Sequence, residues 1–183
     1  MSIIYTTADG RVYEAGDGAV LVIGTSLLTG MITDRTQEDV DHWRLLRDKG
    51  LAGMTVDERS EWLNPMKGRY DYTDLNRVET AVRVISNRIR ELGYVHPFLT
   101  TKANWTRDDV PTREDWDRYF SNVEALRSVI PVLNTTPDAP VVGQKLNYAR
   151  ANDIEQILVD IDDVAVKIQD SWQYAGDFYL GEV

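Results

Sequence analysis

Apolar residues recur at three- and four-residue steps in four stretches of the chain. The longest regular stripe comprises Leu75, Val78, Val82, Ile85, Ile89 and Leu92. This spacing places its members on one face of an α-helix, for which Thr73 is the expected cap and Gly93 the expected end. The other three stripes follow Thr36, Thr112 and Asn147, and a short helix that presents Trp62 and Leu63 is expected after Thr55. The pattern therefore predicts five helices.

Capping residues and helix-breaking residues mark the ends of these helices. Thr36, Thr55 and Thr112 each precede a turn that contains acidic residues, and their hydroxyl groups can accept the unpaired N–H groups of that turn. Thr55 and Glu58 have the Thr-x-x-Glu spacing of a capping box. The remaining helix ends are expected before Gly50, at Asn64-Pro65, at Pro131 and before Gly176.

Both ends of the chain favour β-structure. Residues 3–7 and 19–23 are short β-favouring runs separated by Asp-Gly and Gly-Asp-Gly turn signals, and we expect them to form a hairpin arm. Residues 178–180 favour a last strand. The sequence predicts a mainly α fold: about a five-helix bundle with a small N-terminal β-hairpin arm and a short C-terminal strand. The arm would cover residues 1–33 and the helical domain residues 34–183.

The composition excludes several classes of function. The chain has 183 residues, and its 43% hydrophobic content suffices for one core. A net charge of −10 and a pI near 4.6 argue against nucleic acid and anionic membranes as partners. Without cysteine, the chain has no disulfide, thiolate metal site or cysteine nucleophile. The N-terminus lacks a signal peptide, so we expect a soluble protein made in the cytoplasm.

Charge is distributed unevenly along the chain. Residues 65–104 carry seven Lys/Arg and four Asp/Glu, a net charge of +3. Residues 147–183 carry two Lys/Arg and eight Asp/Glu, a net charge of −6. These segments could pair within one subunit or across a subunit boundary, and pairing within one subunit is the simpler interpretation.

Two polar pairs recur on the predicted helices. Asn76 and Glu79 stand three residues apart in the third helix, and Asn152 and Glu155 have the same spacing in the fifth. The two carboxylates could serve as an acid and base pair on facing helices. Because no nucleophile or glycine-rich loop accompanies them, we expect both pairs to hold neighbouring loop backbone inside the bundle. Arg88, off the apolar stripe, is expected to be exposed.

Metal sites have little support in the sequence. Asp160, Asp162 and Asp163 lack the central glycine and terminal glutamate of a calcium-binding EF-hand loop, so a solvated helix face is expected. His42 and His96 are the only histidines, and no His-Glu-x-x-His motif is present. We therefore expect no metal or other cofactor and no enzymatic activity.

Most of the five tryptophans fall on predicted apolar helix faces, where anchoring the core is their ordinary role. Trp105 differs because it lies in a polar loop. If its side chain is exposed, it could contact a ligand or another subunit. Trp105 is thus a candidate interface residue.

Three short motifs follow one another along the chain: Asp-Leu-Asn-Arg-Val-Glu at 74–79, Asn-Trp-Thr-Arg-Asp-Asp-Val-Pro-Thr at 104–112 and Asn-Asp-Ile-Glu at 152–155. In these motifs, and in its Gly-Glu-Val ending, the chain resembles a group of structural proteins encoded in the tail modules of bacteriophages and prophages. The resemblance covers roughly residues 34–183. It implies a virion component of the tail, baseplate or fibre-attachment region and supplies no catalytic residues.

The leading hypothesis is thus a multi-copy virion protein, a homo-oligomer that docks onto other phage tail or fibre subunits through its two ends. The candidate interface residues are Ile3, Ile4, Tyr5, Val20, Val22, Trp105, Phe178 and Tyr179. The alternative is a carbohydrate-binding or glycan-processing protein of the phage tail that acts at the host surface. Exposed aromatic side chains in the loops or two carboxylates facing one cleft would favour it.

Overall fold

The structure is a computed structural model that describes residues 3–6, 12–15, 28 and 30–176. Its five helices are α1 (Gln37–Gly53), α2 (Val56–Leu63), α3 (Tyr72–Glu91), α4 (Arg113–Arg127) and α5 (Tyr148–Gly176). The predicted mainly α fold class and the five helices are confirmed. None of the described helices is both long and apolar enough to span a membrane.

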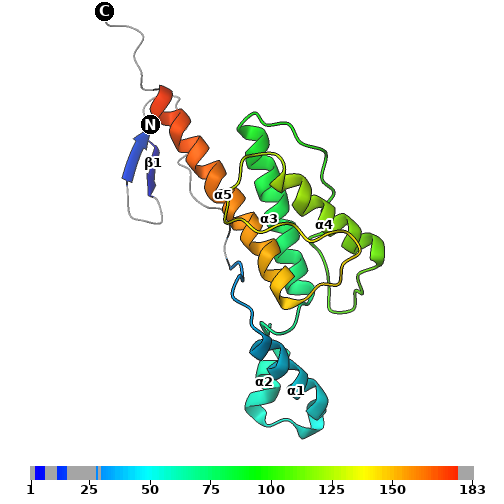
Figure 1. Ribbon diagram of the computed structural model, residues 1–183. Coiled ribbons are helices and arrows are strands. Elements are labelled where there is room, and N and C mark those ends of the chain that lie inside the picture. The colour runs from blue at the N-terminus through cyan, green and yellow to red at the C-terminus, as the bar shows by residue number, and fades with distance from the viewer. Residues whose placement is uncertain (1–2, 7–11, 16–27, 29, 177–183) are drawn as a thin grey trace, which may run out of the picture.

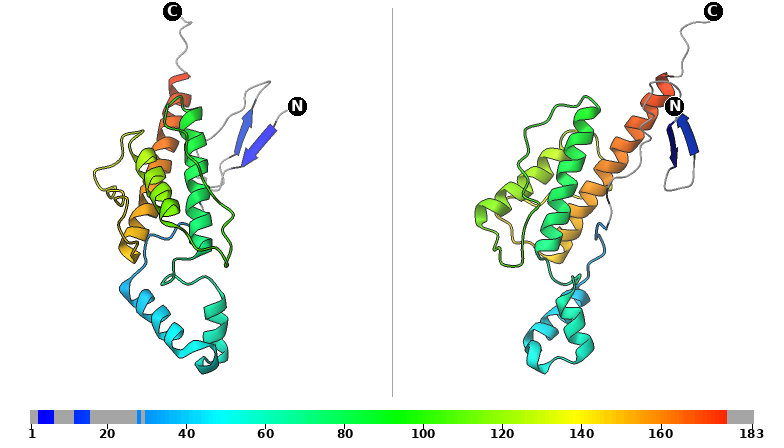
Figure 2. Two further views of the ribbon diagram at one scale, coloured as in Figure 1. Left: turned by 90° about the vertical axis from the view of Figure 1, so that its right-hand side faces the viewer. Right: turned by 180° about the vertical axis from the view of Figure 1, so that it is seen from behind.

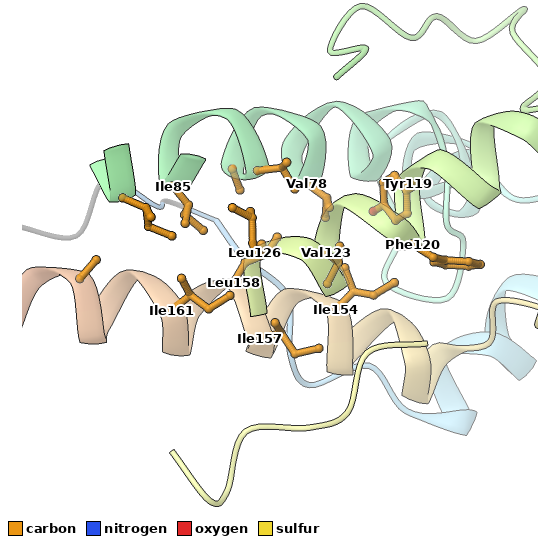
Figure 3. Packing of buried hydrophobic residues seen from close by; sticks show 14 of the residues in the cluster. Val78, Ile85, Tyr119, Phe120, Val123, Leu126, Ile154, Ile157, Leu158 and Ile161 are labelled. Carbon is orange, nitrogen blue, oxygen red and sulfur yellow. The ribbon is translucent and has the colours of Figure 1, made fainter. Parts of the chain in front are cut away.

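Helices α3, α4 and α5 form a three-helix bundle in which each contacts the other two (Figure 1). Their apolar faces meet in a continuous core, part of which is shown in Figure 3. The fully buried members include Val78, Ile85, Val123, Leu126, Ile154, Ile157, Leu158 and Ile161. These positions follow the three- and four-residue spacing in each helix, so burial of the three stripes accounts for the bundle.

Helices α1 and α2 form a separate small lobe at one end of the bundle (Figures 1 and 2). Its core consists of Leu46, Met54 and Met66, with Trp43 and Trp62 packed against it. The two indole rings stack with centroids 6.5 Å apart. So small a core buries little apolar surface, which means that the lobe depends on its attachment to the bundle.

The attachment is a close crossing of the chain segments that enter and leave the small lobe. A Cβ at Gly68 would lie 1.9 Å from the carbonyl oxygen of Asp39. Lys67 Nζ also contacts the Asp34 carboxylate at 2.6 Å. Only glycine allows this approach, so Gly68 determines where the lobe joins the bundle.

The predicted caps Thr36, Thr55 and Thr112 are confirmed, each with a capping box to the residue three positions later. The predicted cap Thr73 is wrong, because Asp71 caps α3 instead. The Asp71 carboxylate accepts the Thr73 N–H at 2.8 Å, and Thr73 itself lies within the first turn. At the predicted helix end, Gly50 has φ +62°, which interrupts the regular geometry of α1.

A two-stranded antiparallel sheet pairs β1 (Ile3–Thr6) with β2 (Val12–Ala15). The described partner of β1 is therefore residues 12–15, which the sequence did not predict as a strand. A closer segment needs a shorter connection, which costs less loop-closure entropy. Residues 19–23 and the predicted C-terminal strand at 178–180 lie outside the described residues.

Candidate functional site: two backbone clamps and a buried charge cluster

The first polar pair holds a loop that follows α3. The Asn76 amide group donates a hydrogen bond to the carbonyl oxygen of Trp105 at 2.9 Å, and its oxygen accepts the Trp105 N–H at 2.7 Å. Glu79 accepts the N–H of Lys102 at 3.1 Å. We call this arrangement the α3 clamp, because two side chains of α3 satisfy three backbone groups of an irregular loop.

The second polar pair holds the segment that precedes α1. Asn152 accepts the Arg35 N–H at 3.0 Å and donates to the Arg35 carbonyl oxygen at 2.9 Å. Glu155 accepts the N–H of Ile32 at 2.6 Å. This α5 clamp therefore makes the same set of backbone contacts as the α3 clamp.

The two clamps are equivalent in register as well as in chemistry. Each asparagine is the fifth residue of its helix, which begins at Tyr72 in α3 and at Tyr148 in α5. In both cases the glutamate binds the N–H of the residue three positions before the one that the asparagine binds. Helix α3 holds the loop before α4, and α5 holds the segment before α1. The half that contains α1, α2 and α3 thus binds the half that contains α4 and α5 through the α3 clamp, and is bound by it through the α5 clamp.

The clamped loops continue in parallel. Thr36 and Thr106 each donate N–H and hydroxyl hydrogen bonds to an aspartate three residues later, Asp39 or Asp109. After Thr36 the chain continues into α1, whereas Pro111 would clash with the preceding turn of a helix started at Thr106. The chain therefore starts α4 afresh after Thr112.

Glu155 of the α5 clamp meets three other charged groups, those of Arg35, Asp74 and Arg77, and we call these four the charge cluster. Glu155 Oε1 lies 2.6 Å from Arg35 Nη2 and 2.8 Å from Arg77 Nη2. Asp74 Oδ1 lies 2.8 Å from Arg35 Nη2 and also contacts Arg77. The Glu155 side chain is 0% exposed, and that of Arg35 is 2% exposed. The two positive and two negative charges balance, which makes burial of the cluster tolerable.

Burial and charge act in opposite directions on the arginines of the cluster. Burial lowers the pKa of Arg35, but the carboxylates of Glu155 and Asp74 outweigh it and leave the pKa above its ordinary value. The pKa of Arg77 is raised by the same two carboxylates against the same burial. Both guanidinium groups therefore stay charged.

The phenol of Tyr70 lies beside the cluster. Its ring is 5.3 Å from the Arg35 guanidinium carbon, and its hydroxyl group hydrogen bonds to that of Tyr119. Burial raises the pKa of both phenols well above the ordinary value, so neither ionises near neutral pH. Both act as neutral hydrogen-bonding groups that close this side of the core.

The α3 clamp has a simpler electrostatic environment. Arg118 of α4 contacts Glu79 at 2.7 Å and donates to the carbonyl oxygen of Thr100 at 2.9 Å. Its hydrogen bond to Glu79 raises the pKa of Arg118. The Glu79 side chain is 1% exposed and that of Arg118 is 22% exposed. One arginine therefore links α3, α4 and the loop between them.

This geometry limits what the two glutamates can do chemically. Each is buried, and each carboxylate is engaged by a backbone N–H and at least one arginine. A general acid or base must reach a substrate within hydrogen-bond distance, which burial in this environment prevents. The arrangement of Asn76, Glu79, Asn152 and Glu155 is suited to fixing loop conformation.

Trp105 does not meet the condition of exposure that an interface role requires, because the residue is 4% exposed and packs in the main core. Asn76 fixes its backbone, and the ammonium group of Lys102 lies 3.6 Å from its ring centroid. Of the other candidate interface residues, Ile3, Ile4 and Tyr5 lie in β1. The rest, Val20, Val22, Phe178 and Tyr179, lie outside the described residues.

The expectation of a solvated aspartate face on α5 is wrong for two of its three members. Asp162 is 0% exposed and pairs with Arg88, and Asp160 accepts the Thr136 hydroxyl hydrogen bond at 2.5 Å. Arg88, expected to be exposed, is only 7% exposed. Asp162 follows Leu158 by four residues, a spacing that places it at the flank of the apolar stripe. The α3–α5 ion pairs also show that the oppositely charged segments pack within one subunit.

No group of three or more His, Asp or Glu side chains among the described residues is placed to hold a metal ion. His42 contacts Glu61 in the small lobe at 2.8 Å. His96 lies near Ser86, with Nε2 3.2 Å from its hydroxyl oxygen. The two histidines therefore belong to different local contacts.

Comparison with known proteins adds no assignment: the chain matches no protein-family profile, no curated protein and no solved structure.

Proposed function

We propose that the protein is a non-enzymatic, multi-copy structural component of a bacteriophage virion, in the tail, baseplate or fibre-attachment region. The observation that carries the proposal is the use of its recurrent Asn-x-x-Glu motifs. Both copies bind backbone segments inside the bundle, and both carboxylates are buried and paired with arginine. The resemblance to phage tail-module proteins supplies the virion context.

A rigid body is suited to a part that transmits position from one subunit to the next. The clamps hold two irregular loops, and the charge cluster joins segments that are 120 residues apart in sequence, from Arg35 to Glu155. Such contacts add little to stability by comparison with an apolar core, but they select one arrangement of the loops. This supports a scaffold with fixed outer surfaces.

The N-terminal sheet is a second feature that favours assembly. Within the described residues it has two strands, and so small a sheet is marginal in water. Its outer edges can pair with a strand of another subunit. Ile3, Ile4 and Tyr5 are therefore proposed contacts in a homo-oligomer and with other tail or fibre subunits.

The alternative of glycan binding is less well supported by the aromatic groups. Trp62, Tyr72 and Trp116 line a groove of about 400 Å³ near the small lobe. However, Trp62 stacks on Trp43 and has Arg69 over its ring at 5.8 Å. Trp116 packs against Tyr119 and Phe120. Sugar rings stack on open aromatic faces, and the rings of Trp62 and Trp116 already contact other side chains of the chain.

The proposal is tested by quantitative mass spectrometry of purified phage particles from a host that expresses the chain. We expect several copies per particle, and particles with defective tails when the gene is deleted. Absence from particles would overturn the proposal. So would hydrolysis of a host glycan that is abolished by Glu79→Gln while the melting temperature stays unchanged.

A further inference from the structure

A basic and apolar surface lies on the side of α3 that faces away from α5. Arg83, Asn87 and Arg90 are exposed along one stripe of α3, whereas Val82 and Ile89 of the same helix are buried in the core. Residues at these spacings share a helix face. The stripe is therefore accessible to a second molecule without any change in the bundle.

The extended segment after α3 completes this surface. Phe98 is 82% exposed and Val95 is 94% exposed. Phe98, Leu99, Arg83 and Arg90 line a cavity of about 320 Å³ between the segment and the helix. We call the set Arg83, Asn87, Arg90, Val95 and Phe98 the α3 docking surface.

The charges of the α3 docking surface are not balanced within the chain. In the described part of the structure no acidic side chain pairs with Arg83 or Arg90, although most other basic residues around α3 have acidic partners. The Arg90 guanidinium carbon lies 5.8 Å from the Phe98 ring centroid, an arrangement typical of a cation–π contact. In a protein of net charge −10, two free arginines beside exposed apolar groups favour an acidic and aromatic partner.

The chain itself contains a segment of that chemistry. Residues 168–183 contain Asp170, Asp177 and Glu182 but no lysine, arginine or histidine. They also contain the aromatic residues Trp172, Tyr174, Phe178 and Tyr179. Helix α5 extends beyond α3 and α4 (Figures 1 and 2) and ends at Gly176. Residues 168–183 therefore have the acidic and aromatic composition that the α3 docking surface favours.

We propose that the α3 docking surface of one copy binds residues 177–183 of a second copy. An aromatic side chain, Phe178 or Tyr179, would enter the cavity beside Phe98, and Asp177 and Glu182 would pair with the two arginines. Because each copy carries both the segment and its receptor, the contact is head-to-tail and extends to rings or filaments. This inference rests on the proposed multi-copy function and names the partner surface.

Complementary charge reversals in the full-length chain test the proposal. The first variant is Arg83→Glu with Arg90→Glu, and the second is Asp177→Lys with Glu182→Lys. By sedimentation velocity at low salt, we expect each variant alone to self-associate at least about tenfold more weakly than the unmodified chain. An equimolar mixture of the two should recover association, because each basic partner then meets an acidic one.

Arg113→Glu is the matched control, since Arg113 is an exposed arginine on α4 with a side chain 87% exposed. This change should leave self-association within about twofold of the unmodified chain. Circular dichroism of every variant verifies that the helices are intact. A labelled peptide of residues 170–183 provides a second measurement, and its fluorescence anisotropy should rise with the unmodified chain but not with the Arg83→Glu, Arg90→Glu variant.

Three results would overturn the proposal: unchanged self-association in both reversal variants, a mixture that stays dissociated, or a peptide that does not bind the unmodified chain. Recovery only when both reversals are placed in one chain would identify a contact within a single copy and would also overturn it. Detection of the protein in phage particles does not depend on any of these results. The proposed function can therefore stand when this inference fails.

Discussion

The α3 clamp and the α5 clamp make the same backbone contacts in different electrostatic surroundings. Glu79 in the α3 clamp pairs with Arg118, whose side chain is 22% exposed. Glu155 in the α5 clamp pairs with Arg77, whose side chain is 19% exposed, and also with Arg35, whose side chain is only 2% exposed. An asparagine and a glutamate three residues apart are thus enough to bind the backbone of a loop. The charged side chains around the glutamate determine how much stability is lost when the clamp is removed.

The difference follows from what each clamp holds. The α3 clamp holds a loop whose two ends already join the adjacent helices α3 and α4. The α5 clamp holds the segment at Ile32 and Arg35, which joins the bundle to the small lobe and the N-terminal region. It fixes the point where the chain enters the small lobe rather than a loop between neighbouring helices, and three buried charges, those of Arg35, Asp74 and Glu155, meet there. Mutations in the two clamps should separate these roles.

The largest effect is expected for Glu155→Ala. Its removal leaves the buried Arg35 and the partly exposed Arg77 with only Asp74 as a carboxylate partner, and breaking a buried ion pair costs about 3–5 kcal/mol. For a chain of this size we expect the melting temperature to fall by about 10 °C. Thermal unfolding followed by circular dichroism measures this, with Arg113→Ala as the exposed control. A fall of less than 3 °C would show that Arg35 and Arg77 do not need Glu155 to compensate their charges.

The two asparagines should have nearly equal effects, because their backbone contacts are the same. Asn76→Asp and Asn152→Asp each keep an acceptor for one N–H but place a carboxylate oxygen against a carbonyl oxygen. We expect a loss of about 1–3 kcal/mol for each in chemical denaturation. Asn76→Ala and Asn152→Ala should lose similar amounts. A difference above about 2 kcal/mol between the two positions would contradict the equivalence of the clamps.

Glu79→Gln should have a smaller effect than the changes at Asn76, Asn152 and Glu155. Glutamine can still accept the Lys102 N–H, and water can solvate the partly exposed Arg118 after its charge partner is lost. We expect a loss of about 1–2 kcal/mol, with faster amide hydrogen exchange confined to the loop at 100–105. Exchange that increases instead at residues 30–36 would mean that the two clamps are coupled.

The smallest effect is expected from Asp109, which follows the loop held by the α3 clamp. Hydrogen bonds from the Thr106 N–H and hydroxyl group lower the pKa of Asp109 below its ordinary value. A carboxylate with a lowered folded-state pKa contributes stability above its unfolded pKa of about 3.9, and that contribution is lost as the pH falls through the folded pKa. The melting temperature of Asp109→Asn should thus lie slightly below that of the unmodified chain at pH 7. The difference should disappear towards pH 2, and a constant difference would contradict this role.

Local features were predictable from the sequence. The three- and four-residue spacing of Leu75, Val78 and Val82 identified the central helix, and the hydroxyl caps Thr36, Thr55 and Thr112 placed three helix starts. Both signals depend on residues within one or two turns of each other, so no knowledge of packing is needed. The cap of α3 was misplaced because Asp71 and Thr73 can both cap, and only the backbone geometry distinguishes them.

The recurrence of Asn-x-x-Glu was also visible in the sequence. It led to the hypothesis that both pairs hold loop backbone. Which backbone segment each motif binds could not be predicted, because it depends on how α3 and α5 pack. Arg35, Asp74 and Arg118 gave no local signal of their role. Arg35 lies 120 residues from Glu155, so no local spacing connects the two. From sequence alone, an arginine outside an apolar stripe is predicted to be exposed to solvent.

Burial of polar residues was decided by tertiary structure for the same reason. Asp162 and Arg88 lie at the flanks of apolar stripes, where a neighbouring helix either covers a side chain or leaves it in water. Here α3 and α5 cover both, and the pair neutralises its own charge. Trp105 is buried because Asn76 fixes its backbone against the bundle. Short-range spacing thus determined the helices and most of their caps. The long-range packing of those helices decided which polar groups meet. A buried charge is stable only beside a partner, and the tertiary fold brings that partner to it.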